Sequence, residues 1–306
     1  MTPSVLAIEA QGLRKVFGRV VAVDNLTLSV GQGEVCGFLG PNGAGKTTAM
    51  KMFLGLIFPS AGRAWLLGRL VDDPRGKEQV GFLPEHFRFH DWLTASEFLY
   101  FHGQLYGMPQ AVLRERIPQV LRRVGLLARA DDKLRTFSKG MLQRIGLAQA
   151  IINNPKVVFL DEPTSGLDPL GRREVRELVH ELKGEGVTVF LNSHILSDVE
   201  MVCDQVAILD GGRVIRAGPL AELLAAELEL EMEVDNVTPP LLERLGTLAS
   251  SVHVADSRLV LKLREEAQIP AIVEAVVSGG GRLYRLTPRR ISLEELFVSL
   301  VEAGKN

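Results

Sequence analysis

Cysteine, net charge and long hydrophobic runs are all scarce in this sequence. Cys36 and Cys203 are the only two cysteines in 306 residues, too few for a disulfide framework or a structural zinc site. A reducing compartment is therefore expected. The formal net charge of −2 leaves no polybasic surface, so we do not expect nucleic acid as a partner.

Hydrophobic segments long enough to span a bilayer are also absent. No window approaches roughly 18 consecutive apolar residues, and residues 1–15 lack the basic segment and apolar core of a signal peptide. We therefore expect a soluble protein. Its composition, 46% hydrophobic and 24% charged, predicts a packed core, and its length is sufficient for two domains.

The first part of the chain alternates short apolar strands with helices, as a parallel α/β core does. Residues 95–152 are predicted to be mostly helical, with breaks at Pro109, Pro118 and Gly125. The other predicted elements are antiparallel strands at 5–10 and 20–30, buried strands at 35–39, 157–160, 187–191 and 205–209, and helices at 46–56, 169–183 and 197–203.

The pattern of apolar and polar residues changes at about residues 218–226, which indicates a domain boundary. Residues 228–234 alternate strictly between apolar and acidic side chains, as a strand with one buried face does. The order of the elements predicted after this point, βαββαβα, contains the split-βαβ pattern of ferredoxin-like folds. We predict a first domain at 1–219, with a helical subdomain at about 86–152, and a small α+β domain at 220–306. The remaining predicted elements are helices at 240–246, 267–277 and 292–302, and strands at 251–255, 258–263 and 282–287.

A phosphate-binding loop follows the apolar strand at 35–39. Residues 40–48 match the pattern G-x-x-x-x-G-K-[ST], and a predicted helix begins near Lys46. Glycines allow backbone N–H groups to wrap a polyphosphate, and the helix N-terminus faces the same anion. The expected ATP ligands are Gly40, Pro41, Asn42, Gly43, Ala44, Gly45, Lys46, Thr47 and Thr48.

Two carboxylates end a second buried strand. Asp161 and Glu162 follow the run 157–160, at the strand end where ligands bind in open α/β sheets. Asp161 is suited to hold Mg²⁺ through water, and Glu162 to orient the attacking water. The sequence therefore predicts a nucleotide hydrolase, and no N-K-x-D motif supports a GTPase.

Several further motifs occur in order along the chain. They are Phe17 seven residues before Asp24, Glu85 in the segment 81–85, Phe-Ser-Lys-Gly-Met at 137–141, Ser-Gly-Leu-Asp at 165–168, and His194. With the phosphate loop they resemble, over roughly residues 5–218, the nucleotide-binding subunits of ATP-binding-cassette (ABC) transporters. In that family these positions are the adenine-stacking aromatic, the Q-loop, the signature L-S-G-G-Q, the D-loop and the switch histidine.

The resemblance implies a P-loop ABC cassette with an antiparallel β subdomain, a mixed α/β core and a helical subdomain. It implies ATP hydrolysis at the inner face of the cell membrane, driven by pairing with a second cassette and coupled to a transmembrane permease. Catalysis is expected from Glu162 and His194. The expected metal ligands are Thr47, Asp161 and Glu85, and the residues expected to act on the partner's ATP are Ser138, Lys139, Gly140 and Asp168.

Two of these residues also have a structural interpretation. Ser138 is a good N-cap for a helix at 139–152, and Asp168 before Pro169 is another. The segment Ser-Asp-Val-Glu at 197–200 also predicts a capping box at the start of the next helix. Lys139 places a cation at the positive end of the first helix, which is unfavourable unless an anion docks there. A phosphate group presented by a second subunit would satisfy both features of that helix.

The sequence departs from the family pattern at four positions. Lys139 replaces a signature glycine, Met141 the signature glutamine, Glu85 the Q-loop glutamine and Phe17 the commoner tyrosine. None of these changes removes a group that hydrolysis requires. The combination resembles the exporter branch called ABC-2, whose cassettes tend to carry a small C-terminal extension.

Aromatic residues are concentrated just after the Q-loop position. We assign Phe98, Phe101 and Tyr106 to the core of the helical subdomain. We expect the permease to dock near Glu85–Trp92, with Phe87, Phe89 and Trp92 as anchors, because aromatic side chains dominate interface cores. The eight residues of this concentration are Phe82, Phe87, Phe89, Trp92, Phe98, Tyr100, Phe101 and Tyr106.

Alternatives stay open at this point. A soluble ABC ATPase that acts on ribosomes or DNA usually fuses two cassettes or carries large insertions, and this chain has one cassette and no basic arm. A non-hydrolysing switch module is disfavoured by Glu162 and His194. Residues 220–306 carry no catalytic constellation, so a regulatory or dimerising role is expected, with a sensory ligand site as the alternative.

Overall fold

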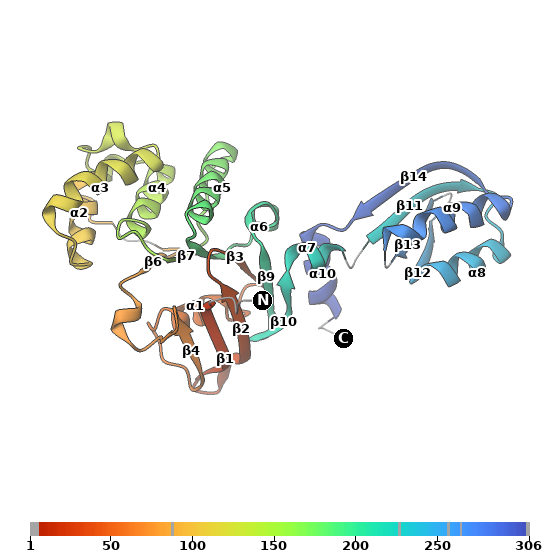
Figure 1. Ribbon diagram of the computed structural model, residues 1–306, viewed down its shortest axis with the longest axis horizontal. Helices are drawn as coiled ribbons and strands as arrows, with labels where there is room; N and C mark the ends of the chain where they lie inside the picture. Colours follow the sequence, from red (N-terminus) through yellow and green to blue (C-terminus); the bar gives the residue numbers. More distant parts are fainter. Residues whose placement is uncertain (1–5, 87–88, 226–227, 256–257, 264, 304–306) are drawn as a thin grey trace. The chain divides into compact units, whose positions relative to one another are not determined.

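The computed structural model describes residues 6–86, 89–225, 228–255, 258–263 and 265–303. The chain forms two compact units, Met1–Ala217 and Gly218–Asn306 (Figure 1). No helix within the described ranges combines the length and the apolar character that crossing a membrane requires.

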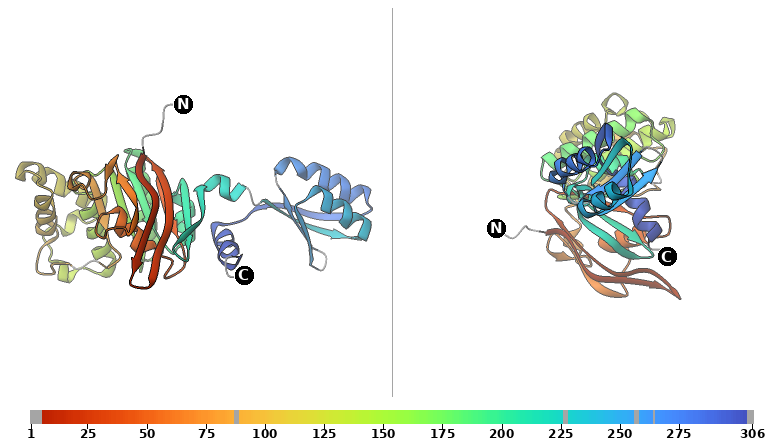
Figure 2. Two further views of the ribbon diagram at one scale, coloured as in Figure 1. Left: turned by 90° about the horizontal axis from the view of Figure 1, so that it is seen from below. Right: turned by 90° about the vertical axis from the view of Figure 1, so that its right-hand side faces the viewer.

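Two β-sheets form the framework of the first unit. Its strands are β1 (Leu6–Phe17), β2 (Val20–Gly31), β3 (Val35–Leu39), β4 (Ala61–Leu66), β5 (Arg69–Leu70), β6 (Val80–Leu83), β7 (Val157–Asp161), β8 (Thr188–Asn192), β9 (Gln205–Asp210) and β10 (Arg213–Pro219). One sheet has the order β2-β1-β4-β5 and the other β10-β9-β3-β8-β7-β6. The long strands β1 and β2 pair antiparallel, as predicted (Figure 2).

Five strands of the larger sheet run parallel, which brings their carboxyl ends to one edge. β3 pairs with β8 and β9, and β7 pairs with β6 and β8, all in parallel. Phe38 is in register with Asn192, which is in register with Asp161. The loops that follow these strands therefore meet at the same edge of the sheet.

An aromatic cluster fixes the helix that follows the phosphate loop. Helix α1 (Lys46–Phe53) buries Phe53 against Phe38 of β3 and Phe190 of β8, with ring centroids 6.4 and 5.4 Å apart. Phe159 of β7 joins the cluster, 5.3 Å from Phe190. Because these rings are fully buried, the C-terminal end of α1 is anchored to the sheet.

Three helices gather at one end of the first unit: α2 (Ala95–Leu105), α3 (Gln110–Arg123) and α4 (Lys139–Ala150) (Figure 1). The predicted break at Pro118 is wrong, because Pro118 lies inside α3. A proline there removes one backbone hydrogen bond, but the buried side chains of Ile117 and Leu121 on either side hold the helix against its neighbours.

The N-caps predicted for two helices are confirmed, and a third is wrong. Ser138 caps α4, and Asp168 caps α5 (Pro169–Gly184) by accepting from the Gly171 N–H at 2.8 Å. The capping box predicted at Ser197 does not form, because α6 (Leu196–Val202) begins one residue earlier. There the Ile195 N–H donates to Ser193 Oγ at 3.1 Å.

The second unit is a four-stranded antiparallel sheet with two helices on one face (Figure 2). The sheet order β12-β13-β11-β14 is that of a ferredoxin-like fold, so this part of the predicted fold class is confirmed. Helices α8 and α9 share a core with the inward side chains of β11 and β13. The elements are α7 (Leu220–Ala225), β11 (Leu228–Asp235), α8 (Pro239–Leu248), β12 (Ser251–Ala255), β13 (Arg258–Leu263), α9 (Ile269–Ser278), β14 (Arg282–Arg290) and α10 (Leu293–Ala303).

The core of this unit gives a first prediction. Leu230 of β11 is fully buried, so Leu230→Ala should lower the free energy of unfolding of the C-terminal unit by about 2–5 kcal/mol. Glu231, its neighbour on the open face, forms an exposed ion pair with Arg289. Glu231→Ala should therefore cost less than about 1 kcal/mol. Hydrogen exchange in increasing urea measures both; equal effects would contradict the assignment of faces.

Candidate active site

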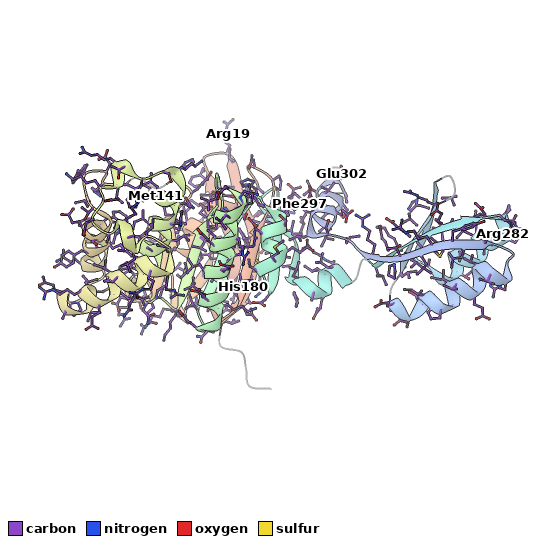
Figure 3. All side chains as sticks on the ribbon, turned by 90° about the horizontal axis from the view of Figure 1, so that it is seen from above. Arg19, Met141, His180, Arg282, Phe297 and Glu302 are labelled. Carbon is purple, nitrogen blue, oxygen red and sulfur yellow. The ribbon has the colours of Figure 1, made fainter. Side chains whose placement is uncertain are left out.

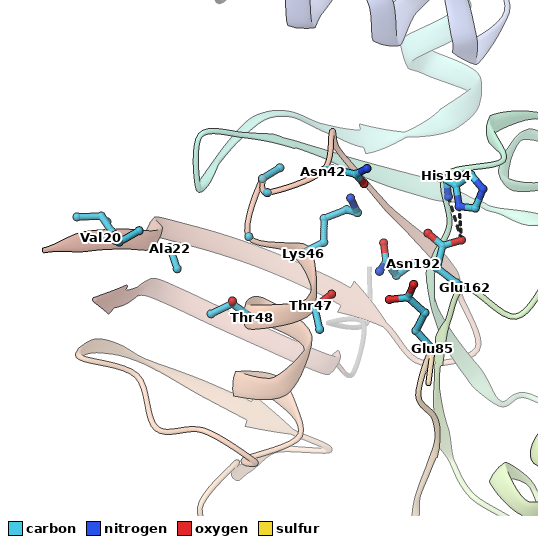
Figure 4. Close-up of a pocket in the computed structure, with 14 residues that line it drawn as sticks. Val20, Ala22, Asn42, Lys46, Thr47, Thr48, Glu85, Glu162, Asn192 and His194 are labelled. Atoms are coloured by element: carbon cyan, nitrogen blue, oxygen red, sulfur yellow. Dashed lines mark hydrogen bonds and ion pairs between the residues drawn. The ribbon is translucent and has the colours of Figure 1, made fainter. Parts of the chain in front are cut away.

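Loops from four parallel strands enclose one cavity of about 550 Å³ at the carboxyl edge of the larger sheet (Figure 4). The phosphate loop follows β3, Glu85 follows β6, Glu162 follows β7, and His194 follows β8. The lining residues are Val20, Val21, Ala22, Asn42, Gly43, Ala44, Gly45, Lys46, Thr47, Thr48, Glu85, Glu162, Asn192 and His194.

The phosphate loop requires glycine at its last turn. Gly45 has φ +96°, and a Cβ at this position would lie 2.2 Å from the Ala22 carbonyl oxygen. Both the left-handed backbone and the close approach exclude any side chain. Gly45 is also the residue before α1, so the turn directs the helix N-terminus toward the cavity.

Lys46 is the buried cation of the site. Its Nζ donates to the carbonyl oxygens of Gly40 at 2.7 Å and Pro41 at 3.1 Å. Burial lowers the pKa of the ammonium, whereas the nearby carboxylates of Glu162, Asp161 and Glu85 raise it. The cation is thus held on the loop and balanced by carboxylates across the cavity.

Glu162 and His194 form a close pair. His194 Nδ1 lies 2.5 Å from Glu162 Oε2. Burial raises the pKa of the Glu162 carboxyl, and the charge and hydrogen bonds of His194 act in the opposite direction. Glu162 also has φ +53°, a backbone conformation that persists only when its surroundings hold it.

Asp161 lies behind this pair, bonded to Asn192. Asn192 Nδ2 donates to Asp161 Oδ1 at 2.5 Å. Burial raises the pKa of Asp161, and this hydrogen bond lowers it. The other amide atom, Asn192 Oδ1, is buried without a hydrogen bond among the described residues, which leaves an acceptor next to the cavity that Asn192 lines.

The residues predicted from the sequence fall into three groups. Most of the phosphate loop, Glu85, Glu162 and His194 line the cavity, and Gly40, Pro41 and Asp161 bond to residues that line it. Phe17 ends β1, is 50% exposed, and has Lys15 Nζ 5.0 Å from its ring centroid. The third group, Ser138, Lys139, Gly140 and Asp168, does not line this cavity.

Sequence reasoning missed four lining residues: Val20, Val21, Ala22 and Asn192. Val20 and Val21 are exposed at the start of β2, where alternation suggested an ordinary strand. The pair Val20-Val21 interrupts the alternation of apolar and polar residues, and this was the one feature of the sequence that could have indicated a role in lining the cavity. Asn192 was visible only as part of the segment that contains the switch histidine.

The predicted helical core is only partly confirmed. Phe98 is fully buried, and Tyr106 donates its hydroxyl to the Val80 carbonyl oxygen at 3.2 Å. Phe101, however, is 40% exposed, so its assignment to the core is wrong. Its ring contacts His90 and His102 along one edge, which leaves another part of the side chain uncovered.

Comparison with known proteins identifies the family. Residues 23–165 match the family model described as ABC transporter. An ABC transporter ATP-binding protein of Nostoc sp. is 43% identical, over 98% of this chain and 91% of its own length. A bacitracin transport ATP-binding protein of Bacillus licheniformis is 33% identical, over 97% and 98% of the two chains. These relationships show that the chain belongs to the ATP-binding proteins of ABC transporters.

A solved structure supports the same assignment of fold. A dimeric ATP-binding cassette, in a post-hydrolysis state with ADP and Pi, has a TM-score of 0.64 and 25% identity, covering 70% of this chain and 98% of its own. The predicted fold class and the predicted ATPase activity are thereby confirmed. The protein is a nucleotide-binding ATPase subunit of an ABC transporter.

The Glu162 environment predicts the pH dependence of the ATPase. The role predicted for Glu162, polarising the attacking water, requires its ionised form, and burial raises the pKa of this carboxyl above the ordinary 4.5. The ionised form is therefore lost at a higher pH than for an exposed glutamate. We expect kcat/KM to fall on the acid side at a pH above 4.5.

A control distinguishes protonation of the enzyme from protonation of ATP. Nucleotide affinity of Glu162→Gln, measured across the same pH range, reports protonation of the triphosphate itself. An ATPase profile that, after this correction, stays flat down to about pH 4.5 would contradict the raised pKa.

Proposed function

We propose that this chain powers export through a separate membrane permease, by Mg²⁺-dependent ATP hydrolysis between two head-to-tail cassettes. The observation that supports this most is the cavity that brings Lys46, Thr47, Glu162 and His194 together at one sheet edge. Export as the direction of transport rests on the resemblance to the ABC-2 branch and on relatives named as Nod factor export ATP-binding proteins.

The donor set in the cavity fits magnesium. Thr47 and Glu85 line it, and Asp161 is fixed behind Asn192. Hydroxyl and carboxylate oxygens are the ligands that Mg²⁺ prefers. We assign these three residues as its protein ligands. When bound, the ion would neutralise charge on the β- and γ-phosphates.

Hydrolysis then needs only positioning and charge stabilisation. The phosphate loop and Lys46 hold the triphosphate in place, and Glu162 accepts a hydrogen bond from the attacking water in line with the γ-phosphorus. His194, 2.5 Å from Glu162, keeps that carboxylate oriented and contacts the γ-phosphate. No covalent intermediate forms on the protein.

The adenine is expected beside Phe17. This ring is exposed at the end of β1. Phe17 pairs with Val20 of β2, and the exposed side chains of Val20 and Val21 line the cavity. An aromatic face and two aliphatic side chains suit a purine ring. Replacing tyrosine by phenylalanine costs little because stacking needs only the ring.

A second cassette completes the site. Ser138, Lys139 and Gly140 begin α4, where backbone N–H groups and the helix dipole favour an anion. We assign the backbone of these three residues, with Asp168 of the D-loop, to the γ-phosphate held by the opposite copy. The two copies can be identical or paralogous.

The membrane partner is expected to dock near Glu85–Trp92, which places the chain on the inner face of the cell membrane. Trp92 is 63% exposed and packs edge-on against His90. The ring of Phe89 packs against that of Phe98, with centroids 5.7 Å apart, and Phe87 lies outside the described residues. An exposed tryptophan backed by packed rings is typical of an interface anchor.

The domain assignment follows the same reasoning. We propose that residues 1–219 form the cassette, with the helical subdomain at about 86–152. Residues 220–306 serve regulation or dimerisation, because the described part of this segment shows a self-contained core and no cluster of metal-binding side chains.

Two variants test the catalytic roles. Glu162→Gln should bind ATP with near-normal affinity while turnover falls by at least about 100-fold, because only the polarised water is lost. Lys46→Ala should instead lose ATP affinity, because the buried cation of the loop is removed. Calorimetric titration and phosphate release measure the two effects. Loss of affinity in both variants would contradict the division of roles.

A further variant tests the docking surface. Trp92→Ala should leave the ATPase of the isolated protein within about twofold but abolish transport and co-purification of a multi-span membrane protein. Tyr284→Ala, which alters an equally exposed aromatic residue at 64% in the C-terminal unit, is the matched control. Equal loss of both activities in Trp92→Ala would count against docking there.

A further inference from the structure

The first turn of α4 lies against the loop that leaves β7 in the same chain. A Cβ atom on Gly166 would lie 2.3 Å from Lys139 Nζ and 2.7 Å from its Cε. The Lys139 side chain therefore crosses directly over the Gly166 backbone. A Cβ on Gly140 would likewise reach Leu167 Cδ2 at 3.5 Å, so the two segments are in contact over consecutive residues.

One helical turn further on, Gln143 contacts the same loop. Its Nε2 donates to the Pro163 carbonyl oxygen at 2.9 Å and to that of Glu162 at 3.5 Å. Lys139 and Gln143 are four residues apart, so they lie on one face of α4. Met141, between them, marks this part of the helix in Figure 3.

The loop needs such support because it carries a strained residue. Glu162 has φ +53°, which a residue with a side chain adopts only when its surroundings enforce it. The Ser165 N–H donates to the Glu162 carbonyl oxygen at 3.1 Å. Gly166, which Lys139 covers, is thus one residue from a hydrogen bond to the backbone of Glu162.

We propose that Lys139 is a positioning residue for Glu162 of its own chain, acting with Gln143 through the loop 162–166. The Lys139 side chain holds Gly166, the Ser165 hydrogen bond carries that restraint to Glu162, and Gln143 holds the adjoining carbonyl groups. The lysine that replaces the signature glycine therefore takes a role in cis, while the backbone of the same turn faces the partner.

The proposal rests on the proposed function in one respect, the assignment of α4 to the partner's nucleotide. If that assignment holds, the turn that senses one ATP also supports the glutamate that hydrolyses the other. Each chain's hydrolysis would then depend on occupation of both sites. The contacts of Lys139 and Gln143 with the loop do not depend on the dimer.

The test is a double-mutant cycle between Lys139 and Gly166 in the full chain, read by steady-state ATPase. Lys139→Ala should lower kcat about tenfold with KM changed less than about twofold, because catalytic geometry is disturbed and nucleotide binding is not. Lys139→Arg should restore most of the rate, since it keeps a long side chain over Gly166. Lys156→Ala is the control, an exposed lysine just before β7, at the strand end opposite Glu162.

Gly166→Ala provides the second arm. In the wild-type background its Cβ would displace Lys139, whereas in Lys139→Ala only the strain of φ +71° remains. In the double variant, the combined loss of kcat should therefore be smaller than the product of the two single losses. Independent effects on kcat, or a rise in KM at unchanged kcat, would overturn the role in cis in favour of a contact between the Lys139 side chain and the partner's phosphate.

The proposed function fails by a different observation. If Glu162→Gln retained wild-type turnover, the catalytic assignment itself would be wrong, whatever the Lys139 variants showed. If Glu162→Gln lost turnover and the cycle showed no coupling, only the positioning role would be lost.

Discussion

The site depends on keeping two buried carboxylates beside a buried ammonium at one edge of a parallel sheet. Asp161 and Glu162 are both buried, and burial raises the pKa of each. Burying a charged carboxylate destabilises the folded protein unless the carboxylate has a hydrogen-bond or ion-pair partner. Asn192 supplies one for Asp161, His194 supplies one for Glu162, and Lys46 compensates the charge across the cavity.

The parallel sheet makes this arrangement possible. Asp161 and Asn192 are in register on β7 and β8, so their side chains meet without any adjustment of the loops. The aromatic cluster anchors the end of α1, the helix that follows the phosphate loop, to the same sheet. The geometry of the candidate site therefore comes from the framework of the sheet, and the loops add the groups that we propose to contact the nucleotide.

Sequence reasoning was strong where the signal is local. The phosphate loop, the caps at Ser138 and Asp168, and the alternation at 228–234 each lie within a few consecutive residues, and each forms as predicted. The signature and D-loop residues were recognised by family resemblance, but their contact in cis depends on two segments that are distant in sequence.

The errors share one physical cause, since each depended on tertiary packing. Pro118 continues a helix because its neighbours are buried, and Phe101 is exposed because the helix turns it outward. Ser197 lost its predicted capping role when α6 began earlier, with Asp198 of that helix held by Arg176 at 2.5 Å.

The central claim is that ATP is enclosed between the phosphate loop of one copy and the Ser138-led helix of another. Sedimentation velocity of Glu162→Gln, with and without saturating ATP and Mg²⁺, tests it most directly. We expect a monomer without nucleotide, a dimer with it, and no dimer when Ser138→Arg is added to block the helix start. A protein that stayed monomeric in saturating ATP, with and without its membrane partner, would contradict the account.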